Sequence, residues 1–82
     1  MATEKVLRDV ATAPNLLERV GWKIRKLRLE KDWSLQMLAD HAGIEKAHLG
    51  RLELGEKEAG LLILQKIADA LEVELWELLR EG

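Results

Sequence analysis

Two histidines and several cationic side chains are the residues of this chain that could do chemistry. His41 and His48 lie seven residues apart, and no cluster of acidic residues accompanies them. The chain has no cysteine, so no thiolate can join them in a metal site. It also lacks a nucleophile–base pair, a carboxylate dyad and a glycine-rich phosphate loop. We therefore expect no metal, no cofactor, no small-molecule substrate and no enzymatic activity.

The cations are distributed unevenly along the chain. The formal net charge is −2, which argues against a uniformly basic nucleic-acid binder. Residues 1–51 hold ten Lys/Arg and seven Asp/Glu, whereas residues 52–82 hold three and eight. Such a chain can still bind nucleic acid through a few well-placed cations, with an affinity that depends strongly on salt. The acidic residues of the second half are expected to form a solvated face: Glu72, Glu74, Glu77 and Glu81.

Apolar spacing predicts the helices that must position these side chains. The stripe that begins at Leu17 predicts an amphipathic helix over residues 15–30. Before it, Pro14 breaks the pattern, because proline disfavours helix in the residue that precedes it. We expect residues 1–14 to form an N-terminal arm or a short helix, and residues 15–82 to form one domain.

Two short helices follow, separated by one glycine. The hydroxyl of Ser34 is expected to cap a helix over residues 35–42. Gly43 should end this helix, because glycine adopts a left-handed backbone conformation at little cost. A second short helix is expected over about residues 45–54, and it closes at Gly55.

Two further helices complete the prediction, over about residues 61–71 and 75–80. No alternating β-branched run and no Asn-Gly or Asp-Gly hairpin signal competes with them. The expected fold is therefore all-α, with five helices and an N-terminal arm or short extra helix. Beyond the first helix, the side chains expected to face the core are Leu35 or Met37, Leu38, Ala39, Leu49, Leu52, Leu61, Leu64, Ile67, Ala68, Leu71, Leu75, Leu78 and Leu79.

The two short helices, over residues 34–54, meet the physical demands of a helix-turn-helix. A small residue must stand where the helices cross, and a glycine must turn the chain between them. Apolar residues must then fill the angle and tie the second helix to the body. The residues that meet these demands, in chain order, are Ala39, Gly43, Ile44, Leu49 and Leu52.

This arrangement resembles the lambda-repressor/Cro-like (xenobiotic-response-element type) helix-turn-helix family. The resemblance covers about residues 16–79 and rests on Ile24-Arg25-Lys26-Leu27-Arg28, Ser34, Leu38-Ala39, Ala42-Gly43-Ile44, Leu49, Arg51-Leu52-Glu53, Gly55, Ile67-Ala68-Asp69-Ala70-Leu71, Val73, Leu75, Glu77 and Leu78. Within the family, the Leu61-Leu62 pair and the short length look most like restriction-modification controller proteins and small phage-type repressors. The resemblance implies a homodimeric transcriptional regulator that binds a palindromic operator in double-stranded DNA.

The resemblance also implies that the second short helix is the recognition helix. Arg51 and Lys46 are our first choices for direct base readout, because a cation at guanine O6 and N7 is the commonest specific contact. Gln36 and Lys57 are expected at phosphates. The DNA-binding residues expected on this basis are Gln36, Lys46, Ala47, Gly50, Arg51 and Lys57.

Four residues depart from the family pattern at this surface. Leu35 stands where glutamine is usual, and Glu45 replaces the usual Ser or Thr at the start of the recognition helix. Ala47 and Gly50 offer no side-chain donor or acceptor. These departures leave an alternative open, a protein-interaction module (antitoxin-like or a regulatory partner) that keeps the fold without DNA readout.

Other residues are expected to support the fold. The family pattern implies a structural ion pair between Arg28 and Glu53 and a core position for Trp33. We expect His41 to be solvated on the surface and His48 to be a partly exposed helix residue.

Apolar residues that lie outside the expected core predict contact surfaces. Those on the last two helices are expected to form a dimer interface rather than a pocket: Leu62, Ile63 and Trp76. On the first helix, Trp22 and Leu29 form a second patch, which we expect apolar residues of the arm to cover, from the same chain or a partner: Val6, Leu7 and Val10. The longest apolar run, residues 61–64, is far short of the ~20 residues that span a bilayer. We expect a cytoplasmic protein that does not bind membranes.

Overall fold

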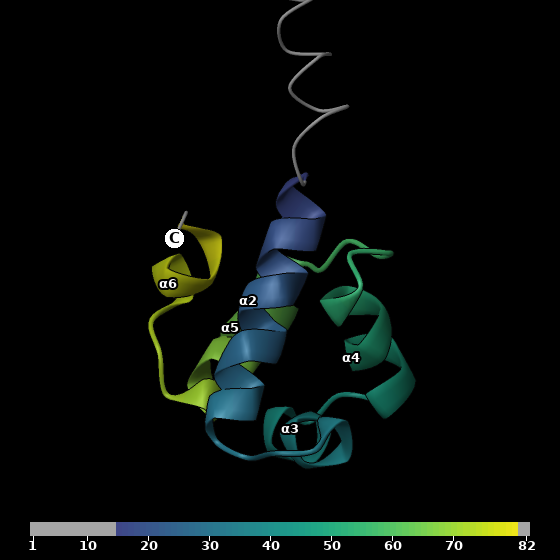
Figure 1. Ribbon diagram of the computed structural model, residues 1–82, viewed down its shortest axis with the longest axis vertical. Coiled ribbons are helices and arrows are strands. Elements are labelled where there is room, and N and C mark those ends of the chain that lie inside the picture. Colours follow the sequence, from purple (N-terminus) through teal and green to yellow (C-terminus); the bar gives the residue numbers. More distant parts are fainter. Residues whose placement is uncertain (1–14, 81–82) are drawn as a thin grey trace, which may run out of the picture.

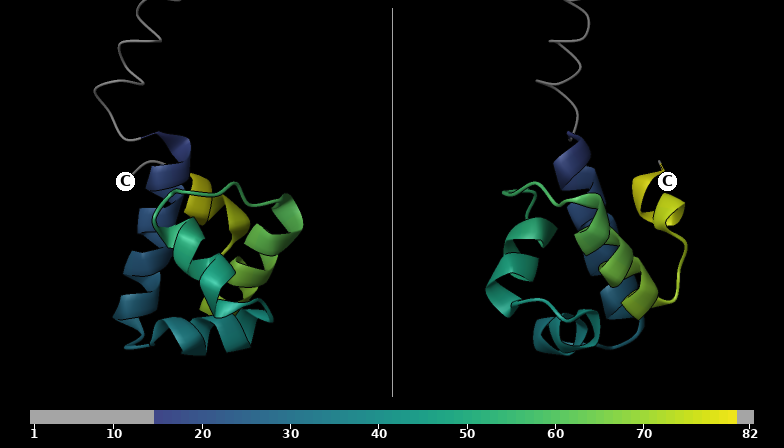
Figure 2. Two further views of the ribbon diagram at one scale, coloured as in Figure 1. Left: turned by 90° about the vertical axis from the view of Figure 1, so that its right-hand side faces the viewer. Right: turned by 180° about the vertical axis from the view of Figure 1, so that it is seen from behind.

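The middle of the molecule is a 15-residue helix, α2, around which four shorter helices pack (Figure 1). The computed structural model describes residues 15–80, and the helices in that range are α2 (Leu16–Glu30), α3 (Leu35–Ala42), α4 (Lys46–Glu53), α5 (Leu61–Leu71) and α6 (Leu75–Leu79). Helices α4 and α6 lie on opposite sides of α2, and α3 crosses at one end (Figure 2). The described residues contain no strand, so the all-α, five-helix expectation is confirmed. The expectations for residues 1–14, including their cover over Trp22 and Leu29, lie outside the described residues.

Side-chain caps and a left-handed glycine set the ends of the first two helices. Asn15 Oδ1 accepts the Glu18 backbone N–H at 2.8 Å, and the Glu18 carboxylate accepts the Asn15 N–H at 3.4 Å. This reciprocal pair satisfies two N–H groups that the first turn of α2 cannot pair internally. Ser34 Oγ accepts the Met37 N–H at 3.1 Å, as expected of a helix cap. Gly43 has φ of 70°, so the expected stop of α3 at a left-handed glycine is confirmed.

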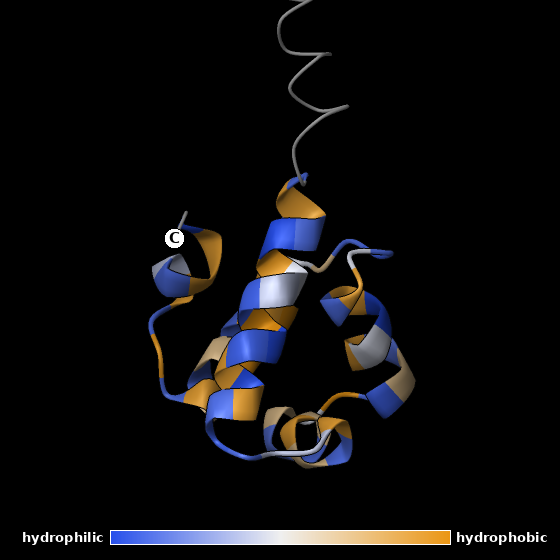
Figure 3. Cartoon of the chain, viewed as in Figure 1, coloured by the Kyte–Doolittle hydropathy of each residue, from blue (hydrophilic) through white to orange (hydrophobic). Residues whose placement is uncertain are grey.

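The core lies between all five helices and holds the two short ones in place. Its buried apolar residues are Val20, Ile24, Leu38, Ala39, Ala42, Leu49, Leu52, Leu64, Ile67, Ala68, Leu71 and Leu78. Figure 3 shows apolar and polar residues alternating around each helix, as one-sided burial requires. Helices of eight residues are unstable alone in water, so α3 and α4 depend on this burial.

Gly21 brings α2 and α4 into direct backbone contact. A Cβ atom built at Gly21 would overlap the backbone carbonyl oxygen of Leu52 and lie 2.6 Å from that of Glu53. Any side chain at this position would therefore push the C-terminal turn of α4 away from α2. Gly21 has no role in the prediction from sequence, although a glycine inside an apolar-periodic helix often has a packing reason.

Two leucines expected in the core are exposed. Leu61 is 69% exposed and Leu79 is 37% exposed, so these two core assignments are wrong. Helical spacing puts Leu61 in line with Leu64, but Leu61 is the first residue of α5 and extends past the end of the core. At the start of α3, Leu35 is half-buried and packs against the core, whereas Met37 is exposed.

Candidate nucleic-acid interface

Helix α4 has a small exposed face beside its buried one. Its two leucines point into the core, while Lys46, Ala47 and Arg51 are exposed and Gly50 is half-buried between them. These four positions are spaced by one, three and four residues, so they share the outward side of α4. The structure thus brings the residues expected at base edges together on one helix face.

Leu35 and Gly50, which depart from the family pattern, lie close together on α3 and α4. Leu35 is half-buried and packs against the core. A Cβ atom at Gly50 would lie 3.4 Å from Leu35 Cδ2, an ordinary van der Waals distance. The structure therefore has room for an alanine at position 50, in contact with Leu35.

The two residues expected at phosphates, Gln36 and Lys57, come from the segments before and after α4. Gln36 is exposed near the start of α3, and its Nε2 donates a hydrogen bond of 2.8 Å to Asp40 Oδ1. Binding a phosphate would require Gln36 to exchange this bond. Lys57 is exposed in the loop after α4, so Lys46 and Lys57 stand at opposite ends of that helix.

The N-terminus of α4 combines opposing electrostatic effects. Glu45 is the N-cap residue, and its side chain makes no capping hydrogen bond. The first N–H groups of a helix carry a partial positive charge that attracts phosphate. The exposed Glu45 carboxylate beside them repels phosphate, and Lys46, the next residue, offsets that repulsion. His48 adds little on this side, since its Nε2 is buried and has no hydrogen-bond partner within residues 15–80.

The expected ion pair between Arg28 and Glu53 is present, and it clamps α4 to α2. Arg28 Nε lies 2.8 Å from Glu53 Oε2, and Nη2 lies 3.0 Å from Oε1. A third bond of 2.8 Å runs from Arg28 Nη1 to the Trp33 carbonyl oxygen, which fixes the loop before α3. The hydrogen bonds to Glu53 raise the pKa of Arg28 above its usual value, although burial acts to lower it. One buried guanidinium thus joins α2, α4 and the loop before α3.

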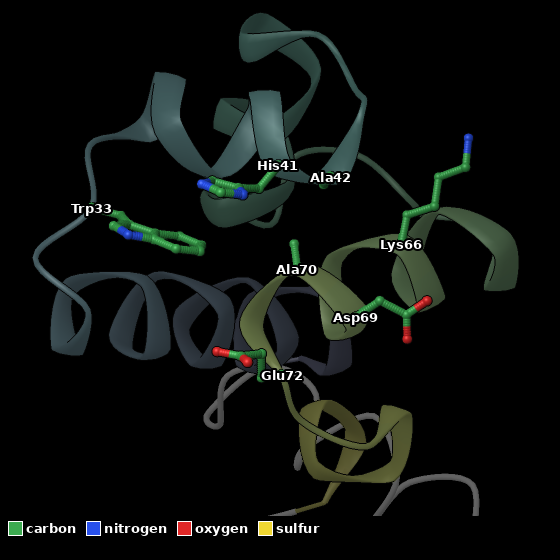
Figure 4. Close-up of a pocket in the computed structure, with 7 residues that line it drawn as sticks. All are labelled: Trp33, His41, Ala42, Lys66, Asp69, Ala70 and Glu72. Atoms are coloured by element: carbon green, nitrogen blue, oxygen red, sulfur yellow. The ribbon is translucent and has the colours of Figure 1, made fainter.

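A stack of two aromatic rings, Trp33 before α3 and His41 within it, supports α3 (Figure 4). The rings of Trp33 and His41 lie 4.3 Å apart and within 1° of parallel. Trp33 is half-buried at the edge of the core, and His41 is exposed but stacked on it. Beside them, Lys31 Nζ lies 3.0 Å from the carboxylate of Glu72. Trp33, His41 and Glu72 border an open depression of about 560 Å³ between α3 and α5. Among the described residues, no three acidic, histidine or cysteine side chains gather closely enough to hold a metal ion.

The residues expected at a dimer interface differ in exposure. Leu62 is 79% exposed and Trp76 is 57% exposed, whereas Ile63 is half-buried and packs against the core. An apolar groove of about 340 Å³ runs between the start of α2, the loop before α5 and the end of α6. Leu16, Leu61 and Leu79 line this groove with partly exposed side chains. Within residues 15–80, no helix is long and apolar enough to cross a bilayer.

Known proteins are similar to this chain in sequence and in fold. A family model described as helix-turn-helix matches residues 24–78. The HTH-type transcriptional regulator SutR of Escherichia coli is 37% identical over 59 residues, which make up 72% of this chain and 33% of SutR. Among solved structures, the restriction-modification controller protein C.AhdI of Aeromonas hydrophila has a TM-score of 0.74 and 34% identity, over 76% of this chain and 94% of that one.

A second similar structure is that of SinR, the master regulator for biofilm formation, in complex with DNA. It has a TM-score of 0.72 and 32% identity, over 74% of this chain and 98% of the SinR chain. The chain spans between 33% and 57% of the length of the curated relatives it matches.

Proposed function

The chain belongs to the helix-turn-helix family, and we propose that it is a DNA-binding transcriptional regulator that acts without catalysis. The observation that carries the proposal is the exposed face of α4, where Lys46, Ala47 and Arg51 stand together on a helix held to α2 by Gly21 and Arg28. SinR, whose fold is similar, has been seen bound to DNA. The proposed role places the protein in the cytoplasm.

The proposed mechanism is insertion of α4 into the major groove. An α-helix with its side chains is about 10–12 Å across, and the major groove, about 12 Å wide, admits it. The Arg51 guanidinium can donate to guanine O6 and N7, and the Ala47 methyl group can pack on a thymine methyl group. Gln36 and Lys57 would position the helix through phosphates. With so few cations, binding depends on each of them, and each phosphate contact adds to the loss of affinity with added salt.

Glu45 provides a test of this placement of α4. Glu45→Ser removes a carboxylate from the phosphate-facing end of α4 and supplies a hydroxyl that can cap the helix. We expect DNA affinity at low salt to rise about threefold to tenfold, by analogy with charges near a helix terminus. Fluorescence anisotropy with labelled duplex DNA measures the change. Glu30→Ser, which removes an exposed acid on the α6 side of α2, is the matched control, and an equal gain in that variant would count against the placement.

We propose that the protein acts as a homodimer through the apolar surface around Leu61 and Leu62. Both side chains are more than two-thirds exposed, and Leu61 lines the groove. A surface that meets itself about a twofold axis would bury these leucines in both copies. We expect Leu62→Glu to halve the molar mass measured by sedimentation equilibrium without loss of helix content. Leu29→Glu, which places a charge on α2 instead, should leave the mass unchanged. A wild-type monomer at all concentrations would contradict the dimer.

A second candidate function is a protein-interaction module that has lost DNA readout. The observation that favours it is the exposed carboxylate of Glu45 at the phosphate-facing end of α4, which makes no capping hydrogen bond. Electrophoretic mobility shift with the DNA upstream of the protein's own gene separates the two functions. The regulator retards that DNA at low salt, where electrostatic binding is strongest, and an interaction module does not.

A further inference from the structure

The exposed face of α4 is apolar where it meets the start of α3. Ala47 is exposed, and Gly50, almost one helical turn further along, is half-buried. Leu35, the first residue of α3, lies beside Gly50, with its Cδ2 3.4 Å from the point that a Cβ atom at Gly50 would occupy. Because Leu35 is only half-buried, part of its side chain stays open to solvent. We call Leu35, Ala47 and Gly50 the Ala47 surface.

The glycine at position 50 keeps this surface open. The Cβ atom of any side chain there would already touch Leu35 Cδ2, and the side chain would occupy space on the exposed face of α4. Without one, a ligand can approach the backbone of α4 closely. The Ala47 surface is therefore both apolar and accessible to a flat ligand such as the edge of a base pair.

The polar side chains of α4 discriminate poorly among bases. Within residues 46–53, the exposed polar side chains are Lys46 and Arg51, and both carry only hydrogen-bond donors. Guanine, adenine and thymine all present acceptors in the major groove, so donors alone separate these bases weakly. Thymine differs from the other bases by its C5-methyl group, which packs favourably on an apolar surface.

We propose that the Ala47 surface selects DNA by the C5-methyl groups of pyrimidines, which are thymines in unmodified DNA. The inference rests on the proposed function, since α4 must lie in the major groove to reach these methyl groups. Ala47 Cβ packs on one methyl group, and Leu35 packs on a second beside the backbone of Gly50. Loss of one methyl group from the DNA should weaken binding about fourfold, the gain expected from burying a group of that size.

Uracil in place of thymine tests the proposal, because the two bases differ only in this methyl group. The probe is a synthetic duplex taken from DNA that the protein retards, with uracil at one thymine position at a time. Fluorescence anisotropy measures the affinity of the full chain for each duplex. We expect a few positions in the site to lose about fourfold in affinity, and thymines elsewhere in the duplex to make no difference.

Methylated cytosine separates a methyl contact from an effect on the DNA itself. At each sensitive position the T·A pair is replaced by C·G and, in a second duplex, by 5-methylcytosine·G. The methylated duplex should bind about fourfold more tightly than the unmethylated one, because it restores the methyl group alone. A uracil effect without this gain would mean that the protein reads DNA stiffness or shape, which would overturn the proposal.

Variants assign each methyl contact to a side chain. Ala47→Ser and Leu35→Gln replace apolar groups with polar ones. Each should bring the ratio of thymine to uracil affinity at its own position from about four to near one. The ratio compares two duplexes on one protein, so a general loss of stability or affinity cannot mimic the effect. Circular dichroism checks that each variant is folded.

Met37→Gln is the matched control, since Met37 is an exposed apolar residue of the same helix as Leu35. Residues two apart on a helix do not share a side, so this variant should keep every ratio of the wild type. An equal change in Met37→Gln, or ratios that both Ala47→Ser and Leu35→Gln retain, would overturn the proposal.

The methyl contact and DNA binding fail in different ways. Retarded DNA with equal affinity for thymine and uracil at every position would overturn the methyl contact and leave the DNA-binding proposal standing. A protein that retards no DNA would overturn both.

Discussion

Arg28→Ala is expected to lower the free energy of unfolding by about 3–5 kcal/mol, because it leaves the Glu53 carboxylate buried without its partner. The side chains of Arg28 and Glu53 are 11% and 7% exposed, so water cannot replace the lost guanidinium. The variant also removes the donor to the Trp33 carbonyl oxygen. The total free energy of unfolding of a small domain is only about 5–15 kcal/mol, so the variant would lose a large part of it. Urea unfolding followed by circular dichroism measures the change.

Arg25→Ala is the control for this prediction, since Arg25 is an exposed arginine on the same helix. It should change stability by less than about 0.5 kcal/mol. Replacing both partners, as in Arg28→Met with Glu53→Met, should cost less than Arg28→Ala alone, because no buried charge is left unpaired. If Arg28→Ala and Arg25→Ala cost the same, the clamp between α2 and α4 does not hold them together.

Gly21→Ala is expected to lower the free energy of unfolding by about 3 kcal/mol, the upper end of the usual range for overpacking. The added methyl group would overlap the backbone oxygens of Leu52 and Glu53, which cannot rotate away as a side chain could. Alanine otherwise favours helix over glycine by about 1 kcal/mol, so a loss of stability here reports the contact between the helices. Thermal unfolding should show a fall in Tm of more than ten degrees, at about 4–8 °C per kcal/mol for a domain of this size.

Gly60→Ala is the matched control, because a Cβ atom there meets nothing within 4 Å and φ is −67°. Gly60 is the N-cap of α5, where alanine costs about 1 kcal/mol or less relative to glycine. A Gly21→Ala variant as stable as the wild type would mean that α2 and α4 are not in contact as described.

Local signals in the sequence predicted most of the fold. Ser34 predicted the start of α3 and Gly43 its end, since helix caps and left-handed glycines act within a few residues. The family resemblance supplied the pair of Arg28 and Glu53. The spacing of apolar residues, however, indicates which face of a helix is buried and not where along the helix the core ends. For this reason it wrongly predicts that Leu61 lies in the core.

Contacts between residues distant in sequence could not be predicted in the same way. Gly21 matters because of where Leu52 and Glu53 pass, which depends on how α4 crosses α2. Leu35 and Gly50 lie on different helices, and only the packing of α4 against α3 brings them close together. Arg80 likewise comes beside Trp22 only because α6 packs against α2.

The central claim is that the exposed face of α4 reads DNA in the major groove. Dimethyl sulfate footprinting tests it most directly, because the reagent methylates guanine N7 at the floor of that groove. On DNA that the protein retards, we predict protected guanines in two clusters about one helical turn, ~34 Å, apart. Arg51→Ala should lose protection at defined guanines, while Arg25→Ala keeps the full pattern. Bound DNA with every guanine N7 still reactive, or the same footprint in Arg51→Ala as in the wild type, would contradict the claim.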